Sequence, residues 1–303
     1  MNTPIGTPAM PEAPVVAARR LHRIGIVGCG VMGAGLAEIC ARAGTGVLVN
    51  VSSDESEARG RTRIERSLAA ATRRGKLTAT DAEAVRSRIS FTTDIGELAD
   101  RQLVFEAVPE NEAAKLQVFR ALDKIVSDPG AVFASNTSSL PVIKLARATE
   151  RPGRVLGVHF FNPAPVLPLV EVISSLLTDA SASAVTEAFV TDVLGKTVIR
   201  SGDRAGFVVN ALLVPYLLAA IRMLESGFAT AEDIDTGMKL GCSHPMGPLA
   251  LVDLIGLDTI AAVGRALYDE FREPAYAVPP LLARMVEGGL LGTKTGRGFY
   301  TYA

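Results

Sequence analysis

Short apolar runs alternate with longer amphipathic stretches through the first two thirds of the chain, which is the pattern of strands alternating with helices. The apolar runs predict strands over residues 24–27, 47–49, 103–108, 131–135 and 155–161. The stretches between them predict helices over 34–43, 55–75, 80–88 and 111–126. This alternation predicts a parallel, doubly wound α/β sheet of the Rossmann type. A further strand over 169–173 follows a proline-rich turn and is predicted to pair with 155–161 as a hairpin.

Beyond Gly202 the pattern is helical throughout. Amphipathic stretches predict helices over residues 207–226, 231–239, 249–253, 258–271 and 280–287, with no convincing strand. The sequence therefore predicts three parts. They are a flexible N-terminal tail over 1–20, an α/β domain over 21–201 and a smaller all-helical domain over 202–303.

The composition narrows the classes of partner. The 31 basic and 32 acidic residues leave a net charge of -1, which provides no general attraction to nucleic acid or to an anionic membrane. The most apolar stretch, 207–221, contains Asn210 and Pro215 and falls short of the ~20 residues of a membrane span. Three scattered cysteines suit a reducing compartment, and no secretion signal is recognisable, so we expect a cytoplasmic protein that binds small molecules or copies of itself.

The first predicted strand runs directly into glycines spaced G-x-G-x-x-G. In this motif Gly28 permits a sharp turn, Gly30 lets the backbone approach a phosphate, and Gly33 lets the next helix pack close to the strand. A purely structural turn is the alternative, but the surrounding strand-helix-strand context favours a dinucleotide site. The predicted cofactor contacts are Gly28, Cys29, Gly30, Val31, Met32 and Gly33.

Asn50 stands at the end of the second strand, where an acidic residue usually binds the adenosine ribose. Its amide can still bond the ribose, but it brings no negative charge to repel a 2′-phosphate. The following residues, 51–54, offer hydroxyl groups and no nearby arginine. NAD is therefore the favoured cofactor, with NADP or dual use left open.

Among the three histidines, His159 lies near the carboxyl end of an apolar strand, and Glu171 lies in the strand predicted to fold back beside it. A carboxylate bonded to one imidazole nitrogen fixes the tautomer and raises the basicity of the other nitrogen. A core histidine bonded to the backbone is the alternative. The nearby carboxylate and the dinucleotide site on the same sheet favour a general base, whereas His22 and His244 are interpreted as structural.

Seven motifs in order resemble the L-3-hydroxyacyl-CoA dehydrogenases, in particular the single-function bacterial 3-hydroxybutyryl-CoA branch. They span the chain from about residue 21 to its end and comprise Gly28–Gly33, Glu106–Asn111, Ser135–Ser139, His159–Pro163, Gly206–Asn210, His244–Pro248 and Gly296–Tyr300. Any one of them occurs by chance in other proteins. The ordered set is specific to this family.

The resemblance implies that His159 takes the proton of the substrate's 3-hydroxyl while hydride passes to NAD, with Glu171 orienting the imidazole. Further roles follow from it by position. Ser138 and Asn210 would hold the reacting oxygen, Glu110, Lys115, Asn162 and Lys294 would contact the dinucleotide, and Ser67, Arg74 and Ser138 would bind the acyl-CoA substrate. The resemblance also implies a homodimer formed through the helical domain.

Departures from the family pattern keep alternatives open. Ala205 and Ala211 stand where the family commonly has proline and arginine. A dehydrogenase of a free 3-hydroxy acid would use the same base without needing Ser67 and Arg74, and a dinucleotide-binding protein without catalysis would need no base at all. The alternative for Lys115 and Lys294 is that they are ordinary surface lysines, and for Ser67 that it is a neutral helix position.

Overall fold

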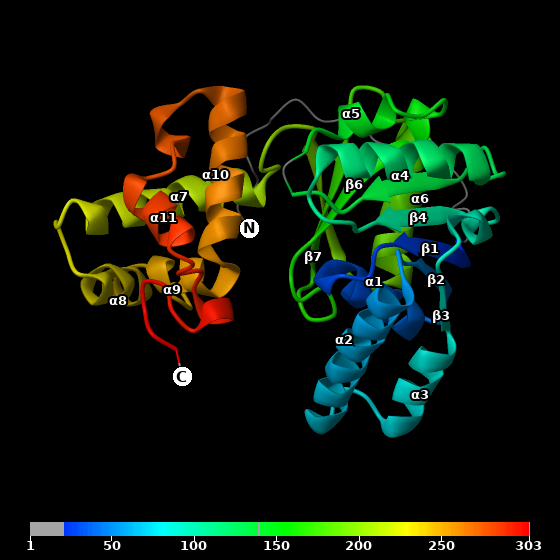
Figure 1. Ribbon diagram of the computed structural model, residues 1–303, viewed down its shortest axis with the longest axis horizontal. Coiled ribbons are helices and arrows are strands. Elements are labelled where there is room, and N and C mark those ends of the chain that lie inside the picture. Colours follow the sequence, from blue (N-terminus) through cyan, green and yellow to red (C-terminus); the bar gives the residue numbers. More distant parts are fainter. Residues whose placement is uncertain (1–20, 139, 303) are drawn as a thin grey trace, which may run out of the picture. The chain divides into compact units, whose positions relative to one another are not determined.

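The computed structural model describes residues 21–138 and 140–302, which divide into two compact units. The first unit contains the described residues up to Thr137 together with Pro141–Asp203, and the second contains residues 138–140 and the chain from Arg204 onward. The predicted tail over 1–20 lies outside the described residues, as does Ser139. In Figure 1 the first unit runs from blue to green and the second from yellow to red.

The first unit is built on one eight-stranded sheet, in the order β3-β2-β1-β4-β5-β6-β7-β8. Its strands are β1 (Arg23–Val27), β2 (Gly46–Asn50), β3 (Ile89–Thr92), β4 (Leu103–Glu106), β5 (Val132–Ser135), β6 (Val155–Phe160), β7 (Leu169–Ser174) and β8 (Thr197–Gly202). All neighbouring strands are parallel except β6 and β7, which pair antiparallel as the predicted hairpin. The carboxyl ends of β1, β2, β4, β5 and β6 therefore lie along one edge of the sheet.

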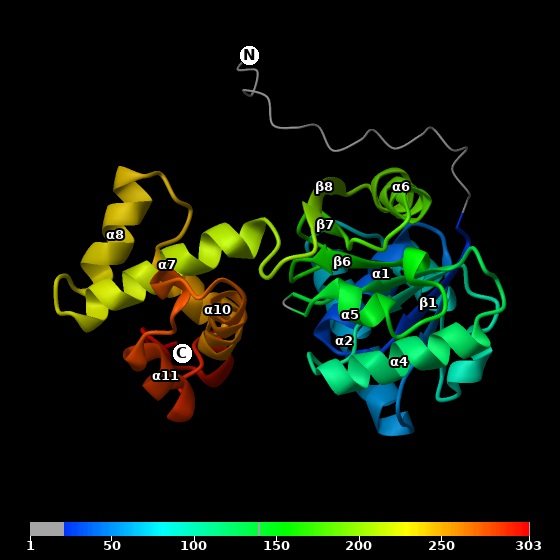
Figure 2. The same cartoon turned by 90° about the horizontal axis from the view of Figure 1, so that it is seen from above.

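Helices cover both faces of this sheet. They are α1 (Val31–Arg42), α2 (Asp54–Arg73), α3 (Ala79–Ser87), α4 (Glu112–Ile125), α5 (Val142–Ala146) and α6 (Ala180–Ala188). Alternate strand residues point to opposite faces, so Phe133 of β5 meets Phe119 of α4, while Phe105 of β4 meets Phe189 beyond α6. Figure 1 shows α4 and α5 above the strands and α1 below them, and Figure 2 shows α6 beside β7 and β8.

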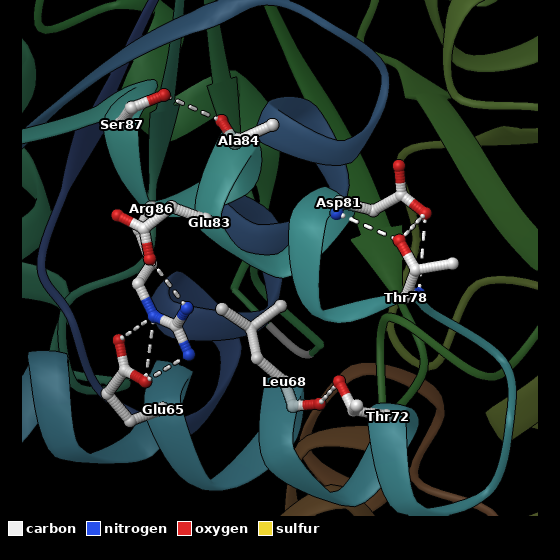
Figure 3. A network of polar contacts seen from close by, with 9 residues as sticks. All are labelled: Glu65, Leu68, Thr72, Thr78, Asp81, Glu83, Ala84, Arg86 and Ser87. Carbon is white, nitrogen blue, oxygen red and sulfur yellow. Dashed lines mark hydrogen bonds and ion pairs between the residues drawn. The ribbon is translucent and has the colours of Figure 1, made fainter.

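Helices α2 and α3 form a hairpin that is fastened by polar contacts (Figure 3). The guanidinium of Arg86 on α3 binds both carboxylate oxygens of Glu65 on α2, at 2.8 and 2.9 Å, and also reaches Glu83 at 3.0 Å. The turn between the helices ends in a capping box, in which Thr78 and Asp81 each bond the other's backbone amide. These contacts join α3 to α2, the arginine-rich helix, while Ile64 and Leu68 of α2 pack into the core.

In its described part the second unit consists of helices without a sheet: α7 (Val209–Glu225), α8 (Ala231–Gly241), α9 (Pro248–Ile255), α10 (Leu257–Phe271) and α11 (Pro280–Glu287). Two buried carboxylates organise it. Asp235 accepts hydrogen bonds from the first amides of α9 and from the Tyr300 hydroxyl, while Asp253 accepts from the Tyr302 hydroxyl and two amides of the C-terminal segment. Burial raises the pKa of both tyrosines, so their hydroxyls stay protonated donors.

The predicted fold class, a Rossmann-type sheet followed by an all-α part, is confirmed. Strands β3 and β8 and helices α5 and α6 were not predicted. The two strands are the edges of the sheet and pair on one side only, so their sequences mix polar with apolar residues. Helix α5 has only five residues, and α6 is built mainly of small ones, so neither gives a strong helical pattern.

Within 21–138 and 140–302, the longest helices are too polar or too short to pass through a lipid bilayer.

Candidate active site

The glycine turn after β1 uses each of its three glycines for a different reason. Gly28 has φ +94°, a conformation that L side chains rarely adopt, and an added Cβ there would lie 2.8 Å from the Ala107 carbonyl oxygen. A Cβ on Gly33 would lie only 2.0 Å from the Gly28 carbonyl oxygen. The helix and the turn therefore approach each other more closely than any side chain at position 33 would allow. At Gly30 a Cβ would meet no described atom within 4 Å, which leaves open space beside the backbone.

Helix α1 begins immediately after this turn and presents its amino end. Among the described residues no side chain caps the helix at Gly30, and no acidic residue stands in its first turn. Burial raises the pKa of the Cys29 thiol to about 11, although Arg63 and Arg61 act in the opposite direction, so the thiol is neutral near pH 7. The turn therefore combines open space, unused helix amides and no negative charge of its own, which fits a pyrophosphate group.

At the end of β2, Asn50 is 8% exposed, and its Nδ2 atom donates a hydrogen bond of 3.3 Å to the carbonyl oxygen of Thr92. Because that partner is an acceptor, the amide orientation is fixed, and Oδ1 is the atom that can accept a bond from a ribose hydroxyl. Asn50 therefore supplies the acceptor that an aspartate would supply at this position, without its negative charge.

One expectation about this loop was wrong. The sequence placed no arginine near the hydroxyl groups after Asn50, but in the structure Arg59 donates to the Ser56 hydroxyl at 2.9 Å. The Ser56 oxygen lies 3.2 Å from that of Ser52, so a guanidinium stands at the edge of the same hydroxyl cluster. The reason is helix α2, which begins at Asp54 and brings Arg59 onto the same side as Ser56 three residues before it.

His159 and Glu171 face each other directly across the antiparallel pair β6–β7. The imidazole Nδ1 lies 2.7 Å from Glu171 Oε2, the carboxylate has no exposed surface, and the histidine is 7% exposed. A carboxylate accepts hydrogen bonds only, so Nδ1 carries a proton and Nε2 carries the lone pair that can accept another. The Phe161 ring packs against the imidazole at 4.6 Å between centroids.

The loop after β5 is joined to this histidine through the backbone. Asn136 Oδ1 accepts a hydrogen bond of 3.0 Å from the amide of Phe160, the residue after His159. Just beyond the end of β6, Asn162 precedes Pro163 in a cis peptide bond. Among the predicted residues of the first unit, His159, Glu171 and Asn162 thus belong to one hairpin, and Glu110 and Lys115 belong to the neighbouring β4–α4 segment.

Ser67 and Arg74 both belong to the arginine-rich helix α2 and its C-cap. They are seven residues apart, which is two helical turns, so they share one face of the helix. Ser67 is half-buried and Arg74 is exposed. The carboxyl group of Glu38 on α1 is buried next to Ser67. Burial raises the pKa of this carboxyl group, and Ser67 and Arg42 partly offset the rise.

The remaining predicted residues, Ser138, Asn210 and Lys294, belong to the second unit. Asn210 stands in the first turn of α7. Lys294 pairs with the carboxylate of Asp258 at the start of α10, and both side chains are 42% exposed.

Residues 23–204 match the family described as the NAD binding domain of 3-hydroxyacyl-CoA dehydrogenase, and 206–302 match the description of its C-terminal domain. The 3-hydroxybutyryl-CoA dehydrogenase of Mycobacterium tuberculosis (strain CDC 1551 / Oshkosh) is 56% identical over 282 residues, covering 93% of this chain and 99% of that protein. The human mitochondrial hydroxyacyl-coenzyme A dehydrogenase is 40% identical over 289 residues, 93% and 91% of the two chains. The crystal structure of (S)-3-hydroxybutyryl-CoA dehydrogenase from Ralstonia eutropha matches with a TM-score of 0.89 at 43% identity, covering 94% and 100%.

The fold and these matches define an NAD-binding oxidoreductase. The chain belongs to the 3-hydroxyacyl-CoA dehydrogenase family, as its ordered motifs predicted. That membership removes the alternative of a dinucleotide-binding protein without catalysis.

Proposed function

We propose that this enzyme interconverts (S)-3-hydroxyacyl-CoA and 3-oxoacyl-CoA, with 3-hydroxybutyryl-CoA as substrate, using His159 as the general acid and base. The observation that carries the proposal is the pair of His159 and Glu171, 2.7 Å apart and almost fully buried. The pair stands near the carboxyl end of β6, on the sheet whose β1 ends in the open glycine turn. Binding and proton transfer groups for an alcohol dehydrogenation are thus carried by one scaffold.

In the oxidative direction, Nε2 of His159 takes the proton of the C3 hydroxyl, and Glu171 stabilises the imidazolium that forms. We assign the reacting oxygen to Ser138 and Asn210, whose hydrogen bonds would polarise the ketone in the reductive direction. The bound nicotinamide supplies the hydride chemistry. Replacing His159 by Gln should abolish turnover with little change in cofactor affinity, and near-normal activity of H159Q would refute the assignment.

For the cofactor, we assign the pyrophosphate to the glycine turn and the adenosine ribose to Asn50, with Glu110, Asn162 and Lys294 as further contacts. NAD(H) is the expected cofactor. Because Asn50 is uncharged and Arg59 stands beside the hydroxyl cluster, we propose that NADPH is accepted as well.

The cofactor assignment is tested by comparing kcat/KM for NADH and NADPH in the wild-type enzyme and two variants. Asn50→Asp places a carboxylate against the 2′-phosphate and should lower the NADPH/NADH ratio by about tenfold or more. Like charges about 4 Å apart cost from ~1 kcal/mol in water to ~4 kcal/mol near a protein surface, and ~1.4 kcal/mol corresponds to a tenfold change. Arg59→Ala should lower the ratio without affecting NADH. An unchanged ratio in both variants would remove the proposed 2′-phosphate position.

For the substrate, we assign the coenzyme A portion to Ser67 and Arg74 on α2, with Ser138 at the acyl end. The initial rate of NADH oxidation with acetoacetyl-CoA should greatly exceed the rate with free acetoacetate. Equal rates would favour the alternative, a dehydrogenase of a free 3-hydroxy acid. Arg74→Ala should raise KM for acetoacetyl-CoA only, because Arg74 is exposed and lies outside the glycine turn.

We further propose that the enzyme is a homodimer that associates through α7. Leu212, Ala219 and Met223 are exposed at helical spacing on this helix, and Phe228 follows at 80% exposure. Monomeric proteins seldom leave such a continuous apolar stripe in water. Leu212→Asp should therefore shift the mass measured by light scattering from dimer to monomer, whereas the control Leu176→Asp, at an even more exposed leucine of the first unit, should not.

The proposed domain roles follow the sequence limits, with cofactor binding in 21–201 and substrate binding and dimerisation in 202–303. All three cysteines are free thiols, which is consistent with the cytoplasmic location we propose. No contact with nucleic acid or membrane is part of this proposal.

A further inference from the structure

A buried ion pair at the end of β4 has no part in the reaction described above. Glu106 has no exposed surface, and the Lys115 side chain, from α4, is 1% exposed. The Lys115 ammonium lies 2.8 Å from each Glu106 oxygen. Glu106 also accepts hydrogen bonds from the Ser135 hydroxyl at 2.6 Å and from the Val108 amide at 2.7 Å. The carboxylate is therefore held by three different segments of the chain.

The Lys115 ammonium lies between two glutamates. It donates a hydrogen bond to each oxygen of Glu106, and it lies 3.2 Å from one oxygen of Glu110 as an ion pair. Because the lysine side chain is almost completely buried, its charge is balanced by these two carboxylates. Lys115 is therefore a bridge between the two glutamates.

The bridge continues to the histidine hairpin. The second oxygen of Glu110 accepts a hydrogen bond from the Thr137 hydroxyl at 2.5 Å, so the loop after β4 is tied to the loop after β5. Asn136, the residue before Thr137, holds the amide that follows His159. The contacts thus run from Glu106 through Lys115 and Glu110 to the loop after β5, which holds the backbone amide next to His159.

The same loop also closes on the glycine turn. The Ala107 amide donates to the Val27 carbonyl oxygen at 2.9 Å, and the Ala107 carbonyl oxygen fills the space that a Cβ on Gly28 would need. The residues just after Glu106 therefore form one wall of the turn assigned to the pyrophosphate. A shift of this loop would move the cofactor site as well as Glu110.

Stability alone does not explain why such a pair is buried. The free energy needed to desolvate two charges is about as large as the free energy gained from their attraction, and well-packed apolar residues often stabilise a protein equally well. We propose that Glu106 is a positioning residue for cofactor binding. Through Lys115 it fixes Glu110 and the loop after β4. The inference rests on the proposed function, which makes Glu110 a cofactor contact.

The test measures the dissociation constant of NADH by fluorescence together with thermal stability, for the wild type and three variants. Glu106→Gln and Lys115→Met each break the pair and should weaken NADH binding by a similar factor, on the order of ten- to a hundredfold, as expected for a displaced contact. The double variant E106L/K115M replaces both charges by apolar groups and should restore the melting temperature, but not the affinity. The exposed pair of Glu112 and Lys144 provides the control, and E112Q should change neither quantity.

Each other outcome overturns the proposal in a defined way. Wild-type affinity in the double variant would mean that the pair is purely structural. Unchanged affinity in E106Q beside weak binding in K115M would mean that Lys115 contacts the cofactor itself. If E106Q does not fold, Glu106→Asp, which shortens the side chain but keeps its charge, takes its place, and wild-type affinity in E106D beside weak binding in K115M would likewise overturn the proposal. Because NADH binding is measured without turnover, failure here is distinguishable from failure of the proposed reaction, which the acetoacetyl-CoA assay reports.

Discussion

The replacement Glu171→Gln separates a catalytic carboxylate from one that merely satisfies a buried histidine. The amide has the shape of the carboxylate but no charge, and it can meet Nδ1 of His159 in two ways. With its oxygen toward Nδ1, the tautomer is kept and the imidazolium loses its anionic partner. With its nitrogen toward Nδ1, the tautomer is reversed, and Nε2 carries a proton where the reaction needs a lone pair.

The expected loss follows from the burial of this contact. Glu171 has no exposed surface, so solvent does not screen its bond of 2.7 Å to the imidazole. A hydrogen bond to a charged group contributes about 1.5–3 kcal/mol, which corresponds to roughly a ten- to 150-fold loss of kcat if the tautomer survives. A reversed tautomer removes general-base catalysis altogether, which amounts to about 10²–10⁴. We expect E171Q to fall within this combined range.

The assay is NAD reduction at saturating (S)-3-hydroxybutyryl-CoA, the direction in which Nε2 acts as the base, with KM for NADH measured in the reverse direction alongside. KM for NADH should stay near the wild-type value, because Glu171 lies behind His159 and away from the glycine turn. The double variant H159Q/E171Q should be no slower than H159Q, since the two residues act as one unit. Glu187→Gln, which breaks an ion pair with Arg200 in the same unit, serves as the control. A kcat for E171Q within threefold of the wild type would refute the reasoning.

Three further outcomes concern stability, measured by urea unfolding. Burial raises the pKa of Glu38 above its ordinary 4.5, so the folded state favours the protonated acid. The protein therefore loses stability as the pH rises from 4.5 through the folded-state pKa. Glu38→Gln should gain stability relative to the wild type as the pH rises above 4.5, and a pH-independent difference would contradict this. Phe105→Ala leaves a cavity at a fully buried site beside Phe160 and should lower the free energy of unfolding by about 3–5 kcal/mol. A loss under ~1 kcal/mol would contradict this expectation. Arg86→Ala breaks only exposed ion pairs between α2 and α3 and should cost less than about 1 kcal/mol, so a larger loss would show that the hairpin depends on them.

Much of this molecule was already determined by the sequence. The glycine spacing after β1, the buried runs of β4 to β6 and the order of the motifs predicted the sheet and the family, because turns, buried strands and helices each impose a local pattern. The pairing of His159 with Glu171 was also predictable. The proline turn between the two strands placed Glu171 in the strand that folds back beside His159, and the register of the folded hairpin sets the two residues directly opposite each other.

Other features are decided only by the folded chain. Lys115 looked like either a cofactor contact or a surface lysine, and its enclosure between Glu106 and Glu110 follows from the way α4 packs over β4. The position of the Arg59 guanidinium beside the hydroxyl groups that follow Asn50 depends on helix α2, which brings it to Ser56. Local sequence patterns determine which helix or strand a residue belongs to. The burial of a side chain and the identity of its partners depend on segments that are distant in sequence and come into contact by packing, and a local pattern does not contain that information.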